Sequence, residues 1–600
     1  MEIITLSLKI IFILFFVGYG FTSIFLPDKF RKDSLIIIPW LGIVFTILFG
    51  VALSFARFPL SQGKSLILLT GLILIIYSVI KKRLILTFSK STLVLGLFTF
   101  ILLIFNLFPL ISKMGFPTTI SLGNLDPLSY ANVGDFLIKN SLLDGNKIIH
   151  FEPHLWAVGD LLYYSFRWGS PLFLGFISSL LNVKSYEVYY ILMSILFSLT
   201  FPLVYLLSTQ FYSKKSYLLM IIIFMTYGMN SILLYMLYNV FLAQFLFSGV
   251  YILILILLLG YFNEKNKEDF SFNSYDLLIG FCISSITSIY PEGLVFVLIP
   301  LAIYLAFKLL TNERLTTLIS LSKILLIIIL INPITLGTAL SWNYKIFFLT
   351  TRTDFIGWER VRYATPFEMT GFYNLFYYKN LPLIFDVFIS IPVIILFSIG
   401  FYKIKNKLLL FSFLLFFLIL YFFYRFIYPN YYAHLKTVSL MVFIFSGIFS
   451  VGVLQSLKII NNKIVLLILI IFMSFLSIRS AHRTMSQLYY HQRSVDKKLI
   501  SLEELNNNKK IKEVFFTSDV FLGDYDLWKR LWQEYLLNNK KIITKTNFTS
   551  ETEDSIKKTK LVLSEKGFTE FGNKKIIYKK IIWENQYYQL GEIEPLEIKM

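Results

Sequence analysis

Long apolar runs constrain this chain more than any other feature of its sequence. A helix that crosses the hydrocarbon core of a bilayer needs about 20 mostly apolar residues. Apolar residues make up 56% of the chain and charged residues 15%, whereas soluble domains are typically about 25% charged. This balance excludes a set of soluble domains and predicts an all-α polytopic membrane protein with about fourteen transmembrane helices. The predicted spans lie near residues 4–26, 34–55, 65–80, 91–112, 186–211, 217–236, 240–262, 275–289, 292–311, 319–340, 382–401, 407–428, 436–457 and 463–480.

The net charge of +20 follows from basic residues that gather in alternate short loops. The positive-inside rule places such loops in the cytoplasm, so we expect a multi-pass cell-membrane protein with no nucleic-acid partner. Both termini and the three long polar segments are then extracytoplasmic. The basic loops are 29–32, 81–90, 214–215, 265–267, 308–314, 403–407 and 458–463, and the polar segments are 113–185, 341–381 and 481–600.

Composition divides the chain into four regions. Residues 1–112 are N-terminal transmembrane helices, 113–185 form the first extracytoplasmic loop, and 186–480 are a transmembrane core that includes the outer loop 341–381. Charge rises and apolar runs shorten after Arg479. The last region, 481–600, alternates strand-like and helix-like patterns, which predicts a small extracytoplasmic α/β domain.

Ionisable side chains avoid the centres of the predicted spans. All five histidines fall on the predicted outer side, and the charged residues assigned to spans lie toward the span ends. Ion-coupled transporters and flippases for charged lipid-linked glycans instead place charged groups at membrane depth. The distribution therefore favours chemistry at the outer membrane interface, although an uncoupled carrier stays open.

The first outer loop has the most informative polar pattern. Asp126 follows the fourth predicted span directly, and Pro127 suits the first turn of a helix that Asp126 would cap. The apolar residues after it form one stripe, which predicts a short amphipathic helix lying on the membrane. The run 170–182 is apolar but too short to span, so we expect it at the interface as well. The stripe consists of Tyr130, Val133, Phe136 and Leu137.

This order of features resembles the GT-C superfamily of integral-membrane glycosyltransferases, which includes protein O-mannosyltransferases and lipid A aminoarabinose transferases. The shared order is an acidic residue after an outward span, an interfacial helix with Tyr130, and a second helix opening with Phe166-Arg167 and Pro171. The resemblance covers roughly residues 91–480 and implies a polyprenyl-phosphate-linked sugar donor, used on the extracytoplasmic side with inversion. The family's acidic motif is often Asp-Glu or Asp-x-Asp. This chain has Asp126-Pro127, so only the single acid carries over.

Two carboxylates are candidates for the catalytic base. Sugar transfer needs a base that takes the proton from an acceptor hydroxyl as it attacks the anomeric carbon. Asp126, just above the bilayer, is the first candidate, with helix capping as the alternative role. Asp135 lies nine residues further on, and we predict by the same reasoning that it faces the same site.

Two cations flank the short outer loop 428–435. A phosphate leaving group needs positive charge nearby, and Arg425 and Lys436 are predicted to supply it at headgroup depth. His434 in the same loop is a further phosphate ligand candidate. The alternative is that both cations only reach toward the interface within a belt of tyrosines.

Further candidates lie in the outer loops. Glu292 in the Tyr-Pro-Glu-Gly turn either contributes to the site or only ends a helix. The loop 341–381 combines aromatic residues, which stack on sugars, with arginines that bind phosphate or carboxylate, here Arg352, Arg360 and Arg362. No cofactor is otherwise indicated, and a divalent metal is left open for His150, Glu152 and His154, whose alternative is a metal-free polar loop.

Together these patterns predict a membrane glycosyltransferase that moves a sugar from a polyprenyl-phosphate donor to an extracytoplasmic acceptor. Its partners would be the lipid-linked sugar, membrane lipids, and a glycan, lipid or protein acceptor. The alternatives are an O-antigen ligase or polymerase, which is also a many-span enzyme, and a non-enzymatic lipid-linked glycan flippase. Whether the donor sugar is a hexose or a pentose stays open.

Overall fold

The computed structural model describes most of the 600 residues, and the architecture below refers to those parts of the chain. The residues outside the description are 84–86, 148–157, 160–166, 213–215, 264–270, 312–313, 351–362, 374–382, 405–406, 461–462, 517–523, 545–560, 568–569, 572–573, 576 and 595–600.

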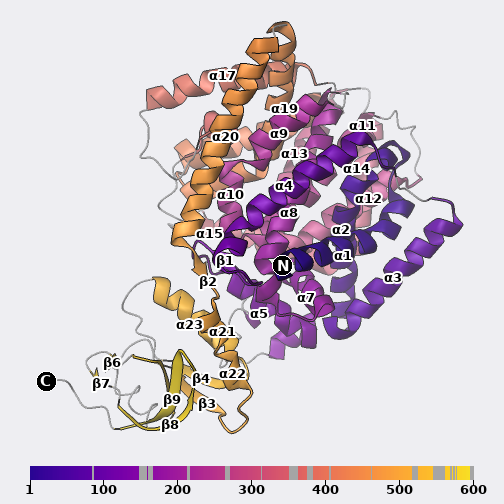
Figure 1. Cartoon of the computed structure of the whole chain (residues 1–600). Coiled ribbons are helices and arrows are strands. Elements are labelled where there is room, and N and C mark those ends of the chain that lie inside the picture. The colour runs from indigo at the N-terminus through magenta and orange to yellow at the C-terminus, as the bar shows by residue number, and fades with distance from the viewer. Residues whose placement is uncertain are drawn as a thin grey trace.

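The helical bundle confirms the predicted fold class, because each predicted span contains helix (Figure 1). Eleven helices in the described part are long and apolar enough to cross a membrane, or twelve if one bent pair counts as a single span. The helices of the bundle are α1 (Glu2–Phe25), α2 (Ser34–Phe55), α3 (Leu60–Ile80), α4 (Lys90–Lys113), α8 (Ser185–Tyr212), α9 (Tyr217–Ile223), α10 (Ser231–Tyr238), α11 (Leu242–Asn263), α12 (Ser274–Ile289), α13 (Leu294–Leu309), α14 (Arg314–Ile331), α15 (Pro333–Thr350), α17 (Leu383–Tyr402), α18 (Lys407–Phe422), α19 (Tyr431–Ile460) and α20 (Lys463–His491).

Two predicted spans are broken for local reasons. The span near 217–236 bends by 49° between the π-helix η4 (Phe224–Gly228) and α10. There the Asn230 side chain caps α10 by accepting hydrogen bonds from the backbone N–H groups of Ile232 and Leu233. The span near 319–340 divides into α14 and α15, because Pro333 removes a helical hydrogen bond and suits the first turn of a new helix.

The centre of the bundle is formed by α8, α11 and α19. In its most apolar stretch α19 is completely buried, whereas the corresponding stretch of α3 is only 22% buried and faces outward. Close helix approaches support this packing. A side chain at Gly400 in α17 or at Gly452 in α19 would collide with the backbone of the partner helix.

Two shorter helices, α5 (Asp126–Lys139) and α7 (Gly169–Leu181), fill the end of the bundle after α4. That both lie at the membrane interface stays a prediction. The stripe residues Tyr130, Val133 and Leu137 belong to the bundle core, and most of α7 is inaccessible to solvent. The apolar stripe of α5 therefore packs on protein, chiefly on α7 and α8.

The C-terminal region forms the predicted α/β domain. Its five-stranded sheet has the order β4-β3-β5-β9-β8, with β3 parallel to β4 and β5 and the remaining pairs antiparallel. Strands β8 and β9 form an antiparallel hairpin. The elements are α21 (Lys497–Ile500), α22 (Glu503–Asn506), β3 (Glu513–Phe516), α23 (Asp524–Leu536), β4 (Lys541–Thr544), β5 (Val562–Glu565), β6 (Glu570–Phe571), β7 (Lys574–Lys575), β8 (Tyr578–Glu584) and β9 (Tyr588–Ile593).

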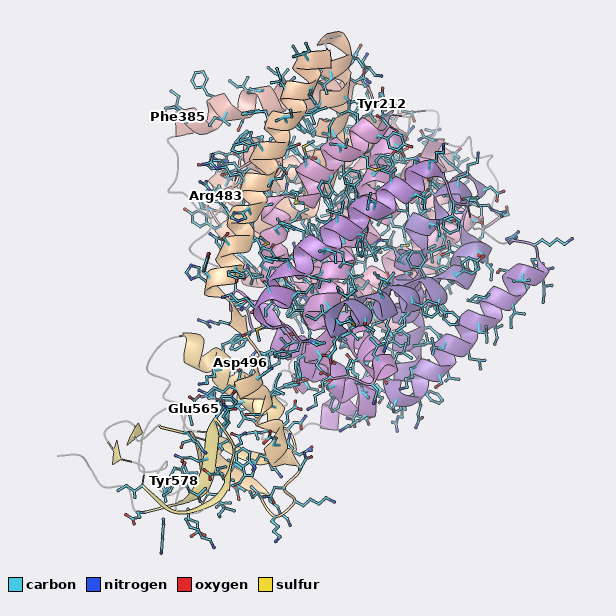
Figure 2. All side chains as sticks on the ribbon, viewed as in Figure 1. Tyr212, Phe385, Arg483, Asp496, Glu565 and Tyr578 are labelled. Atoms are coloured by element: carbon cyan, nitrogen blue, oxygen red, sulfur yellow. The ribbon has the colours of Figure 1, made fainter. Side chains whose placement is uncertain are left out.

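The C-terminal domain is tied to the first predicted outer loop. Strand β1 (Ile120–Ser121) pairs antiparallel with β2 (Arg493–Ser494), and Thr118 Oγ1 donates to the Val495 carbonyl at 2.6 Å. Figure 2 shows Tyr212 at one end of the bundle and Asp496 at the other, beside this domain. The segments 113–185 and 481–600 thus meet at one end, as the predicted topology requires, while the side of the membrane stays a prediction.

Candidate functional site

Helix α5 presents two different faces, and this separates the two predicted catalytic carboxylates. Successive residues of an α-helix turn by about 100°, so Asp135 lies about half a turn away from Asp126. Tyr130 lies on the Asp126 side and is buried in the bundle core. Leu128 and Ala131, on the Asp135 side, are buried in a second apolar cluster with residues of the C-terminal domain. The prediction that Asp135 faces the same site as Asp126 is therefore wrong.

Asp126 is the first residue of α5 and is half-buried. The N-cap position is occupied by Leu125, whose side chain makes no capping hydrogen bond. Asp126 therefore does not have the N-cap position that the sequence suggested as its alternative role. Asn124 holds this turn in place. Its Oδ1 accepts from the Asp126 backbone N–H at 3.2 Å, and its Nδ2 donates to the Asn239 carbonyl at the end of α10 at 2.7 Å.

A buried ion pair joins the start of α7 to the turn between α12 and α13. Arg167 Nη2 donates to Glu292 Oε1 at 2.6 Å, and Arg167 Nε lies 3.5 Å from Glu292 Oε2. The two side chains are only 18% and 16% exposed. Arg167 Nη1 also donates to the Tyr130 hydroxyl at 3.4 Å, which brings the pair to the Asp126 face of α5. Glu292 thus forms an ion pair with Arg167, in addition to lying at the helix end where the sequence placed it.

The ring of Tyr290 brings a second cation to the same place. The Arg167 guanidinium lies 4.9 Å from the Tyr290 ring centre, and the Lys436 ammonium lies 5.9 Å from it. Lys436 projects from α19 and also stacks over the Tyr432 ring at 4.4 Å. Two cations thus share one aromatic ring, and Glu292 neutralises part of their charge. Positive charge held in this way suits an anionic group such as phosphate.

Tyr130 links Asp126 to these cations electrostatically. Burial raises the pKa of the Tyr130 hydroxyl; the nearby Arg167 charge lowers it and the Asp126 charge raises it, with a net increase. Tyr130 therefore stays protonated at physiological pH and can act only as a neutral hydrogen-bonding group. We define the core site as Asp126, Tyr130, Arg167, Glu292 and Lys436.

Arg167 is the member of the core site that residue types alone did not single out. In the sequence it stands out only as part of the stretch from Phe166-Arg167 to Pro171. The structure adds a second signal, because its φ of +57° lies in the left-handed region that a bulky side chain seldom adopts. Such backbone strain persists where surrounding contacts fix the residue, often at functional sites.

Asp135 bridges the bundle to the C-terminal domain. Its Oδ1 accepts from the Ser185 backbone N–H at 3.1 Å, and its Oδ2 accepts from the Tyr535 hydroxyl of α23. Burial raises the pKa of the Asp135 carboxyl above its ordinary value, although both hydrogen bonds act in the opposite direction. These contacts are those of a docking residue.

Arg425 and His434 lie in a separate aromatic cluster. Arg425 belongs to the π-helix η6 (Phe423–Ile427), and its Nη1 donates to the Tyr421 hydroxyl at 2.7 Å. The fully buried His434 ring packs on Tyr421 and Tyr363, with centroid distances of 4.8 and 5.1 Å. His434 and Lys436 are two positions apart on α19, a rotation of about 200° around the helix axis. Their side chains therefore project from nearly opposite faces of the helix. Arg425 and Lys436 thus lie against different rings. The prediction that both reach one phosphate from the same short loop is not supported by these contacts.

The remaining candidates lie outside the described residues. They are the arginines of the second long loop, Arg352, Arg360 and Arg362, and the metal ligand candidates His150, Glu152 and His154. Among the residues that the structure does describe, no group of three or more His, Cys, Asp or Glu side chains is placed to hold a metal ion.

Comparisons with known proteins include two similar solved structures. No family model and no curated protein matches the chain. The archaeal oligosaccharyltransferase AglB from Archaeoglobus fulgidus, solved with an inhibitory peptide and a dolichol-phosphate, is 14% identical with a TM-score of 0.47, over 78% of this chain and 69% of that one. ArnT from Cupriavidus metallidurans in the apo state is 10% identical with a TM-score of 0.44, over 84% and 98%. At these scores the likeness assigns neither donor nor acceptor.

Proposed function

We propose that this chain is a membrane glycosyltransferase that moves a sugar from a polyprenyl-phosphate donor to an extracytoplasmic acceptor. The observation that carries the proposal is the core site. Two half-buried cations, Arg167 and Lys436, share the Tyr290 ring there, and Arg167 contacts the Tyr130 hydroxyl, which also experiences the charge of the half-buried Asp126 carboxylate. A transferase of this kind needs a base on one side of the anomeric carbon and positive charge at the leaving phosphate on the other.

The reaction assigns a task to each group. As the acceptor oxygen forms its bond to the anomeric carbon, its proton passes to the Asp126 carboxylate. The bond between the anomeric carbon and the phosphate oxygen breaks, and its electron pair leaves with the polyprenyl phosphate. Lys436 and Arg167 stabilise the charge that develops on this phosphate. Glu292 fixes the direction of the Arg167 guanidinium through the fork-like contact, and the Tyr290 ring fixes its plane.

The other candidates take outer roles in this scheme. Arg425 would contact the donor at a different point from Lys436, within the aromatic cluster that also holds His434. Asp135 keeps the C-terminal domain docked on α5. The loop arginines Arg352, Arg360 and Arg362 would shape the substrate side.

Asp126→Asn is the test of this function. The variant keeps the shape of the side chain but removes the base, so sugar transfer should fall about 100-fold or more. Binding of undecaprenyl phosphate should stay within about twofold, because both cations remain. The control is Asp28→Asn, which removes a carboxylate that is 86% exposed at the predicted cytoplasmic end.

Transfer is measured with purified protein and a panel of polyprenyl-phosphate sugars, after membrane insertion and folding of each variant have been verified. Wild-type transfer by Asp126→Asn would refute its role as base. A flippase would give another pattern, since it would move the labelled donor across vesicle membranes and form no glycosylated product in either protein.

A further inference from the structure

A polar cavity lies between the first loop and the C-terminal domain, away from the core site. It has a volume of about 570 Å³, within the range of roughly 300–1,000 Å³ that is common for ligand sites. Its walls come from the end of α5, the residues before α8, the helices α21 and α22, and the turn after α23. The proposed reaction leaves this cavity without a role.

The charge of the cavity favours an anionic ligand. Three lysines, Lys139, Lys184 and Lys497, line it together with Glu503 and Glu504. Lys184 is paired with Glu503 at 2.6 Å. Lys497 stacks over the Phe116 ring at 5.6 Å, a contact that leaves an ammonium group able to donate hydrogen bonds to an anion.

The uncharged part of the wall favours hydroxyl groups. Four asparagines, Asn506, Asn507, Asn538 and Asn539, line the cavity, and each amide offers both donors and an acceptor. Asn506 Nδ2 donates to the Leu536 carbonyl at 2.6 Å, while its Oδ1 is buried without a hydrogen-bond partner among the described residues. Among the described residues that line the cavity, Ile500 is the only apolar one, so these walls offer little to a lipid chain or an aromatic ring.

We propose that this cavity binds an acidic glycan, as a subsite for a remote part of the acceptor. The lysines bind its carboxylate or phosphate groups, and the asparagine amides bind its hydroxyls. Helix α5 sets the spacing, because Lys139 lies thirteen residues from Asp126, a distance of about 20 Å along the helix. The bound part of the acceptor is therefore several sugar units from the reacting hydroxyl. This proposal rests on the proposed transferase function.

Direct binding to the full-length protein in detergent tests the subsite. The probes are hexagalacturonate, neutral maltohexaose and inorganic phosphate. Hexagalacturonate should bind saturably, and each of the other two should bind at least about 10-fold more weakly, because each lacks half of the recognised chemistry. Its affinity should also fall as salt is raised, since Lys139 and Lys497 are exposed and Lys184 is partly exposed.

The double variant Lys139→Gln/Lys497→Gln should weaken hexagalacturonate binding about 10-fold or more. The matched control is Lys509→Gln/Lys510→Gln, which removes the same charge from exposed positions of the same domain outside the cavity. No saturable hexagalacturonate binding, equal binding of maltohexaose or phosphate, or an equal loss in both double variants would overturn the proposal.

Asp126→Asn separates this proposal from the transferase function. That variant should bind hexagalacturonate as the wild type does, because Asp126 is far from the cavity. Normal transfer by Asp126→Asn would refute the catalytic proposal and leave the binding result intact. Loss of binding in the cavity variant alone refutes neither the base nor the phosphate site.

Discussion

Removing the charge of Glu292 should slow sugar transfer without weakening donor binding. Glu292→Gln keeps the side-chain size but loses the charge-assisted hydrogen bond of 2.6 Å to Arg167. Such a bond contributes about 1.5–3 kcal/mol. Arg167 would then be held by the 3.4 Å contact with Tyr130 and by the Tyr290 ring. A guanidinium displaced by about 1 Å can cost about 100-fold in rate, so we expect kcat to fall 10- to 100-fold.

Donor affinity should change in the opposite sense. Glu292 neutralises part of the positive charge on Arg167 and Lys436, and without it both cations can attract a phosphate more strongly. The dissociation constant of undecaprenyl phosphate should therefore stay the same or decrease in Glu292→Gln. In Arg167→Gln, which removes a cation, that constant should instead rise about 10-fold or more.

A double-mutant cycle on kcat/KM measures whether Glu292 acts through Arg167. If it does, Arg167→Gln/Glu292→Gln should resemble Arg167→Gln alone, with a coupling free energy of at least about 1.4 kcal/mol. The control Glu584→Gln breaks the exposed ion pair with Lys566 and should change transfer less than about twofold. Two independent losses that multiply, or a raised dissociation constant in Glu292→Gln, would refute this positioning role.

Three further predictions concern the donor, the topology and the docking of the C-terminal domain. Lys436→Gln and Arg425→Gln should each weaken undecaprenyl phosphate binding roughly 10-fold, measured by titration; unchanged affinity in the double variant would move the lipid site elsewhere. A membrane-impermeant thiol reagent added to intact cells should label Ser501→Cys and leave Ser89→Cys unlabelled, because the first is predicted outside; labelling of Ser89→Cys alone would invert the topology. Burial raises the pKa of Asp135, so docking of α23 should be most stable at low pH and should weaken as pH rises through the raised pKa, as measured by hydrogen exchange of α23. Asp135→Asn should remove this pH dependence. An equal pH dependence in the wild type and in Asp135→Asn would refute the role of Asp135 in docking.

The helical architecture was predictable because span length and apolar content are local properties of the sequence. Each predicted span contains helix, although two are broken and only eleven or twelve of the described helices are long and apolar enough to cross a membrane. The C-terminal α/β domain was also found. Breaks within spans were less predictable. The bend before α10 depends on the capping side chain of Asn230, which the hydropathy of the surrounding residues conceals.

The surroundings of α5 were not predictable from its own pattern. A stripe of Tyr130, Val133 and Leu137 fits a helix on a membrane and a helix on protein equally well, since both offer an apolar partner. In addition, Leu128 and Ala131 on the opposite face are buried in a second apolar cluster. That face receives the C-terminal domain, which is more than 300 residues away in the sequence and leaves no trace in the α5 pattern.

The core site combines residues that the sequence could nominate with contacts that it could not. Asp126, Glu292 and Lys436 stand out as polar groups at predicted span ends. Their convergence depends on Arg167, which binds Glu292 across 125 positions of sequence and shares the Tyr290 ring with Lys436. A sequence pattern formed by neighbouring residues cannot predict a contact between residues so far apart in the chain.

The spacing of two cations was also a poor guide to their meeting point. Arg425 and Lys436 are close in sequence, but η6 ends and α19 begins between them, and each then faces a different set of rings. On one helix the direction of a side chain changes by about 100° per residue, so a separation of two positions is enough to part His434 from Lys436. Direction therefore decides which predicted residues share a site, and sequence distance does not. The same reasoning puts Asp126 at the core site and Asp135 at the domain interface, on opposite faces of a single short helix.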